Sequence, residues 1–293
     1  MKVSYLLRFY ERGIREFQGV NLQSADLSGV VLVAVDFSRS NLMGVNFARA
    51  FLTKSNFSSA ACNWANFTYG KLSEALFNGA DLTKANFTGA FMVKAQLIGS
   101  HLSGANLSHS NLRGGNLMGA NLCGAILYRV NLREAIVRDC NLQWSNFQEA
   151  RLSKADMSGS NAYQANFTRS FMKEVNLSYS NLNEANLYGA KLNQANLRGA
   201  NLQRANLREA KLVGADLRGA DLRGAYLQNA DLQMANLEGA ILTRANLAGA
   251  NLAGANLTHT NLKNSHLDHT IIPEAIARML GLDFTTHTIG TTP

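Results

Sequence analysis

A register of five residues, kept without insertion or deletion, constrains this chain more than any other feature. From Leu22 to Leu267 there are 50 central positions five residues apart; 36 are Leu and eight are Phe. The remaining central positions are Cys62, Met92, Val137, Met157, Ala162 and Met172. Such a short and uninterrupted period predicts a solenoid built of repeated structural units.

The other positions of the repeat indicate the shape of each unit. Two residues before the centre, 44 of the 50 positions are Ala, Ser, Gly, Cys or Thr, and immediately before it 33 are Asn or Asp. A period of five matches neither a helix nor a simple strand. One large and one small inward residue per repeat predict a short extended segment and a tight turn, because Asn, Asp and Gly suit turns. The backbone must then bond to neighbouring coils.

Several repeats carry a recognisable signature. Ala105-Asn106-Leu107 and Ala185-Asn186-Leu187, each followed by two variable residues, match the pattern A(D/N)Lxx. On these motifs the chain resembles the pentapeptide-repeat family over about residues 18–272. The resemblance implies an all-β fold, a right-handed quadrilateral β-helix with four pentapeptides per coil and short helical caps at both ends. The opening Leu6-Leu7-Arg8-Phe9-Tyr10 is similar to that of many cyanobacterial members.

Both ends of such a solenoid need covers, because an open end exposes apolar core and unpaired strand edges. Leu6 and Tyr10 fall at helical spacing near the start, and Pro273 stands where the first turn of a helix would begin. The predicted segments are an N-terminal helical cap at 1–17, the repeat β-helix at 18–272, a C-terminal capping helix at 273–283 and a disordered tail at 284–293.

The four faces of a 20-residue coil differ in composition. All eight central Phe belong to the two faces whose centres end in 7, which predicts stacked ladders in the core. On the face that runs from Leu32 to Leu252, only four of 12 residues before the centre are Asn or Asp, against 29 of 38 on the other faces. That face also has ten basic and four acidic residues, within a chain whose net charge is +8.

We predict a partner-binding surface on this face, which we call the basic face. Aromatic and Arg side chains are enriched in interfaces, and Phe51, Phe91 and Phe171 are expected to point outward there. The alternative, a face that is only solvated, is left open. Trp64 and Trp144 share another face and are the second place to look. The candidate residues are Phe51, Lys71, Phe91, Arg113, Arg133, Arg151, Phe171, Lys191 and Lys211.

Enzymatic chemistry is not indicated. The chain has no dinucleotide-binding glycine motif, P-loop, nucleophile elbow or His-Glu-x-x-His pair. No cofactor or metal is expected, because the histidines near the C-terminal end have no evident further ligands. The three cysteines predict free thiols in a reducing compartment. Without a signal peptide or an apolar run of ~20 residues, we expect a cytoplasmic protein.

Three functions remain, and they differ in the partner. The first is a protein–protein interaction module, regulatory or scaffolding, that binds along one face. The second is binding of an anionic polymer such as nucleic acid, or of a membrane surface, by the basic face. The third follows from the resemblance, because some family members mimic DNA and inhibit type II topoisomerases; a net charge of +8 disfavours it. Self-association through an end or a face is also left open.

Overall fold

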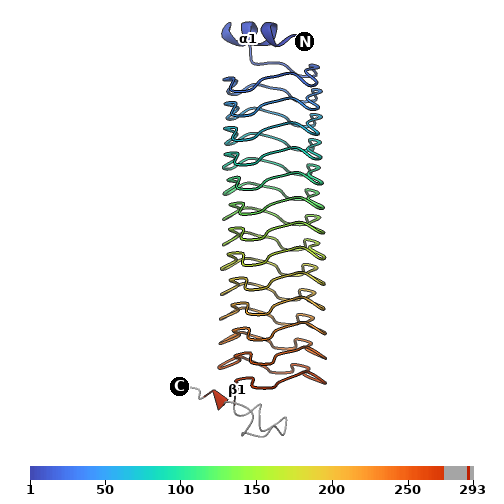
Figure 1. The fold of residues 1–293 in the computed structure, drawn as a ribbon, viewed down its shortest axis with the longest axis vertical. Helices are drawn as coiled ribbons and strands as arrows, with labels where there is room; N and C mark the ends of the chain where they lie inside the picture. Colours follow the sequence, from blue (N-terminus) through green and yellow to red (C-terminus); the bar gives the residue numbers. More distant parts are fainter. Residues whose placement is uncertain (274–288, 291–293) are drawn as a thin grey trace. The chain divides into compact units, whose positions relative to one another are not determined.

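Coils of 20 residues build the protein. The computed structural model describes residues 1–273 and 289–290, in an N-terminal unit, Met1–Ala150, and a C-terminal unit, Arg151–Pro293. Within each unit, parallel bridges join residues 20 apart in successive coils, for example Phe51 to Lys71 and Lys191 to Lys211. The coils of both units are visible in Figure 1. Each coil therefore contains four pentapeptides.

In a pentapeptide with Asn before its centre, every backbone N–H group donates a hydrogen bond. In one repeat of the N-terminal unit, the N–H groups of Asn41, Leu42 and Gly44 donate to carbonyl oxygens of neighbouring coils at 2.9, 2.7 and 3.0 Å. The Val45 N–H closes the turn onto the Leu42 carbonyl at 3.1 Å. The Met43 N–H donates to Oδ1 of Asn41 at 3.2 Å. Asn or Asp before the centre is therefore preferred because its side chain holds the turn N–H that no coil accepts.

The core of each unit consists of the central residues and the small residues beside them. Every central residue from Leu22 to Leu252 is at most 2 % exposed. Where the small position is Ser, the hydroxyl has a partner; Ser170, for example, donates to the carbonyl of Phe167 at 2.8 Å. A buried hydroxyl without a partner would be costly, so these serines are compatible with the core.

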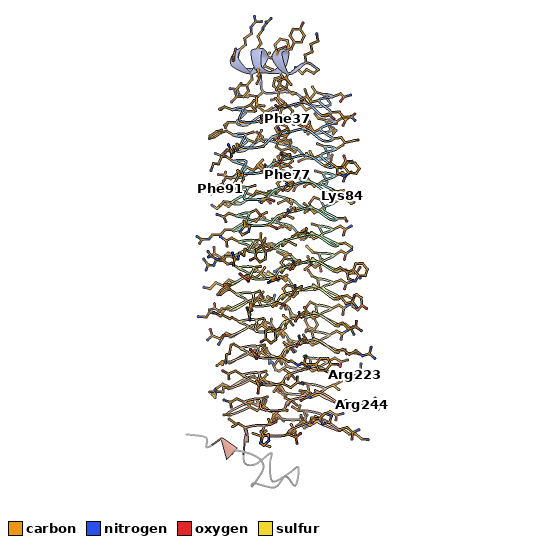
Figure 2. All side chains as sticks on the ribbon, in the orientation of Figure 1. Phe37, Phe77, Lys84, Phe91, Arg223 and Arg244 are labelled. Carbon is orange, nitrogen blue, oxygen red and sulfur yellow. The ribbon has the colours of Figure 1, made fainter. Side chains whose placement is uncertain are left out.

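Two ladders of Phe rings fill the core of the N-terminal unit between Phe37 and Phe87. The rings of Phe57 and Phe77 stack with centroids 4.8 Å apart, and those of Phe67 and Phe87 do the same. Across the core, Phe67 and Phe77 meet edge to face at 5.6 Å and 85°. Figure 2 shows Phe77 inside the coils. These contacts confirm the predicted ladders in this unit, in the two arrangements that aromatic rings prefer.

The N-terminal unit begins with α1, Val3–Glu11, the only helix among the described residues. Its Leu6 is fully buried, and the Tyr10 hydroxyl accepts a hydrogen bond from the Val33 N–H at 3.0 Å. The Arg15 guanidinium lies 3.7 Å from the centroid of the Tyr10 ring. These contacts connect the helix to the first coils of the unit (Figure 1).

The C-terminal unit ends in two short strands. Strand β1, Ile272–Pro273, pairs in parallel with β2, Ile289–Gly290. Pro273 thus lies in a strand, and the rest of the predicted capping helix at 273–283 lies outside the described residues. Of the predicted tail at 284–293, only Ile289–Gly290 is described.

Candidate partner-binding surface

The basic face is built from side chains that the coil turns outward. Residues before the centre form the bridges between coils, and their side chains point away from the core. In one coil of the N-terminal unit the central Phe87 is fully buried, whereas Phe91, before the next centre, is 45 % exposed. Figure 2 shows Phe91 at the edge of the unit, with Phe77 in its interior. The sequence position alone decides which ring is core and which is surface.

In the N-terminal unit the outward residues form an apolar cluster. Val31, Phe51, Lys71 and Phe91 are bridged in succession through four coils. The side chains of Val31 and Phe51 are 54 % and 46 % exposed. Nζ of Lys71 lies 3.5 Å from the centroid of the Phe91 ring, a cation–π contact. Val31 was not among the predicted contact residues, although its apolar side chain in the same column was the signal. We call these four residues the N-terminal cluster.

The C-terminal unit presents a more basic arrangement on its own coils. Arg151, Phe171, Lys191 and Lys211 are bridged in succession. Phe171 is 40 % exposed, and Nζ of Lys191 lies 4.6 Å from the centroid of its ring. Lys211 pairs with Asp231, with Nζ and Oδ2 3.6 Å apart. These four residues are the C-terminal cluster, and each unit thus holds an exposed ring covered by a lysine.

Ion pairs neutralise part of the charge of the basic face. All four of its acidic residues have basic neighbours: Glu74 pairs with Lys54, and Glu134 with Arg113 at 3.0 Å. Glu174 pairs with two lysines. Exposed pairs of this kind contribute about 0–1 kcal/mol each. Within the described residues, the cations of this face that form no ion pair are Lys71, Lys94, Arg133, Arg151 and Lys191.

The face gives up a hydrogen bond that most repeats of the other faces keep. Where it does have Asn or Asp before the centre, the side chain accepts the turn N–H, as at Asn111, Asn131 and Asn251. Phe51 and Phe91 have no acceptor atom for this role, and the turn N–H after each of them donates no hydrogen bond to a described residue. A net hydrogen bond contributes about 0.5–1.5 kcal/mol. The exposed rings therefore cost stability, and folding does not explain why they are there.

The second predicted location lies elsewhere on the N-terminal unit. Trp64 and Trp144 occupy the same turn position four coils apart, and each is 55 % exposed. Nζ of Lys84 lies 5.9 Å from the centroid of the Trp64 ring. These two tryptophans stand in one column at a turn position. They do not replace the Asn or Asp before the centre, so placing them costs no hydrogen bond to the turn N–H.

The two buried cysteines of the N-terminal unit have raised pKa values. Burial raises the pKa of the Cys62 thiol, with a further contribution from Asp81, and raises that of Cys140 to about 12. Neither thiol is therefore a nucleophile at neutral pH. The described residues contain no group of three His, Cys, Asp or Glu side chains arranged to hold a metal ion. None of the helices described is both long and apolar enough to span a membrane.

The sequence places the chain among known proteins. The profile of the family described as Pentapeptide repeats matches it eight times, at residues 21–58, 60–97, 100–139, 140–178, 180–219, 205–244, 231–268 and 245–276. The chain belongs to the pentapeptide-repeat family. This confirms the resemblance predicted from the A(D/N)Lxx motifs. A comparison with curated protein sequences found no match.

Three solved structures are similar to this pentapeptide-repeat protein. HetL, involved in heterocyst differentiation regulation in the cyanobacterium Nostoc sp. strain PCC 7120, is 32 % identical over 94 % of this chain and 98 % of its own, with a TM-score of 0.26. Rfr23 from the cyanobacterium Cyanothece 51142 is 42 % identical over 35 % and 63 %, with a TM-score of 0.19. Full-length QnrB1, a plasmid-mediated fluoroquinolone resistance protein, is 17 % identical over 91 % and 97 %, with a TM-score of 0.24. At these TM-scores the assignment to the family rests on sequence.

Proposed function

We propose that this protein is a non-enzymatic interaction module, regulatory or scaffolding, that binds a protein partner through the basic face. The N-terminal and C-terminal clusters, with the flanking Arg113 and Arg133, are the contact residues. Proteins of the pentapeptide-repeat family are generally structural or protein-binding modules, which supports this class of function. A cytoplasmic location belongs to the proposal, because all three cysteines are free thiols.

One observation carries the proposal: the basic face exchanges the turn-holding Asn for exposed Phe and Lys. Phe51 and Phe91 replace an acceptor side chain with a ring that is nearly half exposed. Exposed apolar area without a folding benefit is typical of protein contact sites, where aromatic anchors dominate binding energy. Selection for stability alone would favour Asn at these positions.

The rings also favour a protein partner over an anionic polymer. A surface for phosphate backbones needs unpaired cations, but five of the ten on this face are in ion pairs, among them Lys54, Arg113 and Lys211. Lys71 and Lys191 lie over Phe rings, which lets cation and ring form one contact patch. Apolar rings bordered by cations fit an interface with an apolar core and a polar rim.

The experiment compares captured proteins between variants of the tagged full-length chain. Phe51, Phe91 and Phe171 are changed together to Asn, which restores the turn acceptor and so preserves the fold. We expect at least one protein retained by the wild type to be lost, because each anchor contributes about 1–3 kcal/mol to binding. The captured proteins are quantified by mass spectrometry at low and at high salt.

A charge-reversal variant separates the two classes of partner. Lys71→Glu, Arg151→Glu, Lys191→Glu and Lys211→Glu together should mainly slow association with a protein partner. If these changes abolish binding while the Asn variant still binds, and affinity falls steeply with salt, the ligand is an anionic polymer or surface. Equal capture by all three proteins would show that the basic face is only solvated, and attention would move to Trp64 and Trp144.

A further inference from the structure

The C-terminal unit contains a basic pocket that belongs to neither cluster. Its volume is about 470 Å³, and it lies on turn positions of four successive coils. Four of its lining residues are cations, and the lining contains no acidic and no aromatic side chain. The complete lining is Gln203, Arg204, Arg223, Gly224, Thr243, Arg244, Lys263 and Asn264.

Gly224 makes the hollow. The turn positions before and after it in the column carry Arg204 and Arg244, and Gly224 contributes no side chain between them. A Cβ placed on Gly224 would lie 3.8 Å from Cγ of Arg204, in ordinary contact. The backbone there has φ of +64°, which Asn tolerates among the non-glycine residues. Gly224 thus leaves a gap between two arginines, and a side chain at this position would narrow the pocket.

Two of the four cations in the pocket form ion pairs, and the other two form none with a described residue. Arg223 donates from Nε and from a terminal nitrogen to the Asp221 carboxylate, at 2.9 and 2.6 Å. Burial raises the pKa of Asp221, but these hydrogen bonds outweigh it and the pKa is lowered. Arg204 pairs with Glu184 at 3.5 Å. Arg244 and Lys263 form no ion pair with any described residue.

We propose that this pocket binds a chain of two or three linked phosphate groups. Arg204 and Arg244 stand two coils apart, roughly 10 Å at the usual strand spacing, so an extended anion matches the column better than a single phosphate. Figure 2 shows the side chains of Arg223 and Arg244 on the same side of the unit. Because the lining has no aromatic ring to stack a base, a nucleoside triphosphate and inorganic tripolyphosphate are recognised alike. Guanidinium groups are suited to phosphate oxygens.

Isothermal titration calorimetry with sodium tripolyphosphate tests the proposal on the full-length protein. Arg244→Asn with Lys263→Ser should weaken binding by about tenfold, because charge-assisted hydrogen bonds are lost. The matched control, Arg39→Asn with Arg49→Asn, removes two exposed cations from turn positions of the N-terminal unit and should stay within about twofold, since distant charges are screened. Melting curves establish that each variant is folded.

A third variant separates the pocket from its charge. Gly224→Asn places a side chain between Arg204 and Arg244 without changing the net charge, and tripolyphosphate binding should be weakened. ATP should bind like tripolyphosphate, and inorganic phosphate at matched ionic strength about tenfold more weakly, because it makes fewer charge-assisted contacts. The proposal is overturned if the Gly224 and Arg244/Lys263 variants bind like the wild type, or if inorganic phosphate binds as tightly as tripolyphosphate.

Discussion

Around Phe67 the N-terminal unit fills its coils with stacked rings, whereas around Leu207 the C-terminal unit fills the equivalent positions with Leu. The backbone hydrogen bonds are the same in both regions. The N–H of Phe67 and the N–H of Leu207 each donate to a carbonyl oxygen of the next coil at 2.7 Å. Hydrogen bonds therefore set the spacing of the coils, and side chains pack within it. The 4.8 Å step between the stacked rings of Phe67 and Phe87 equals the usual distance between strands, so the spacing of the coils suits parallel stacking.

The largest expected effect comes from emptying the ring ladder. Phe67→Ala removes a fully buried ring that stacks on Phe87 and meets Phe77 edge to face. We expect it to lower the free energy of unfolding by about 3–5 kcal/mol, and Leu207→Ala by about 2–5 kcal/mol. Urea unfolding measures both. A smaller loss at Phe67 than at Leu207 would mean that the ladder adds nothing to the packing.

Exchanging the two fillings should produce an intermediate effect. Leu207→Phe places a ring in a column of Leu and should cost about 1–3 kcal/mol through overpacking. Phe67→Leu keeps the apolar filling but leaves part of the ring volume empty. Calorimetric melting of both variants checks whether each region is packed for its own residues. If Leu207→Phe raised the melting temperature, the C-terminal core would have unfilled space and the two fillings would be interchangeable.

A gain is expected where the filling is incomplete. Ala162 is a fully buried central residue in a column of large residues, and the neighbouring Tyr163 is turned outward to Glu184, with its hydroxyl 3.4 Å from Oε2. Ala162→Leu should stabilise the protein by about 1 kcal/mol. Ala165→Leu is the matched control: Ala165 is buried at a small position, where overpacking destabilises. A lower melting temperature for Ala162→Leu would show that the site is already full.

The smallest expected effect distinguishes how the two units hold their carboxylates. Burial raises the pKa of Asp36, but hydrogen bonds from Ser38, Gln18 and Asn56 together lower the pKa by more than burial raises it. The net shift is downward. In the C-terminal unit the pKa of Asp216 is lowered, chiefly by its hydrogen bond with Arg218.

Because both folded-state pKa values are depressed, the stability from each carboxylate is present above the unfolded value of about 3.9 and is lost as pH falls through the folded value. We expect losses below about 1 kcal/mol each in melting experiments between pH 7 and pH 2. Added salt should reduce the contribution of Asp216, which has a charged partner, more than that of Asp36. Equal salt sensitivity of Asp36→Asn and Asp216→Asn would contradict this distinction.

The five-residue register predicted much of this structure because each position has one physical task. It predicted that Phe57 and Phe77 would stack in the core and that Phe51 and Phe91 would point outward, since position within the repeat determines direction. The register did not show that Lys71 lies over the Phe91 ring, because the rotamer of a long side chain depends on neighbours 20 residues away. The pocket at Gly224 was missed for the same reason. Only the side-chain positions show that Arg244 and Lys263 form no ion pair with any described residue.

The central claim is that exposed rings serve binding and buried rings serve folding, and Phe87 and Phe91 test it within one coil. Phe87→Ala and Phe91→Ala each remove one phenyl ring. The two variants are compared for the free energy of unfolding and for capture of the partner. The account predicts a loss of about 3–5 kcal/mol for Phe87→Ala and a change within about 0.5 kcal/mol for Phe91→Ala. Of these two variants, only Phe91→Ala should weaken capture while the protein is folded. A large loss of stability with Phe91→Ala, or undiminished capture by it, would contradict the claim.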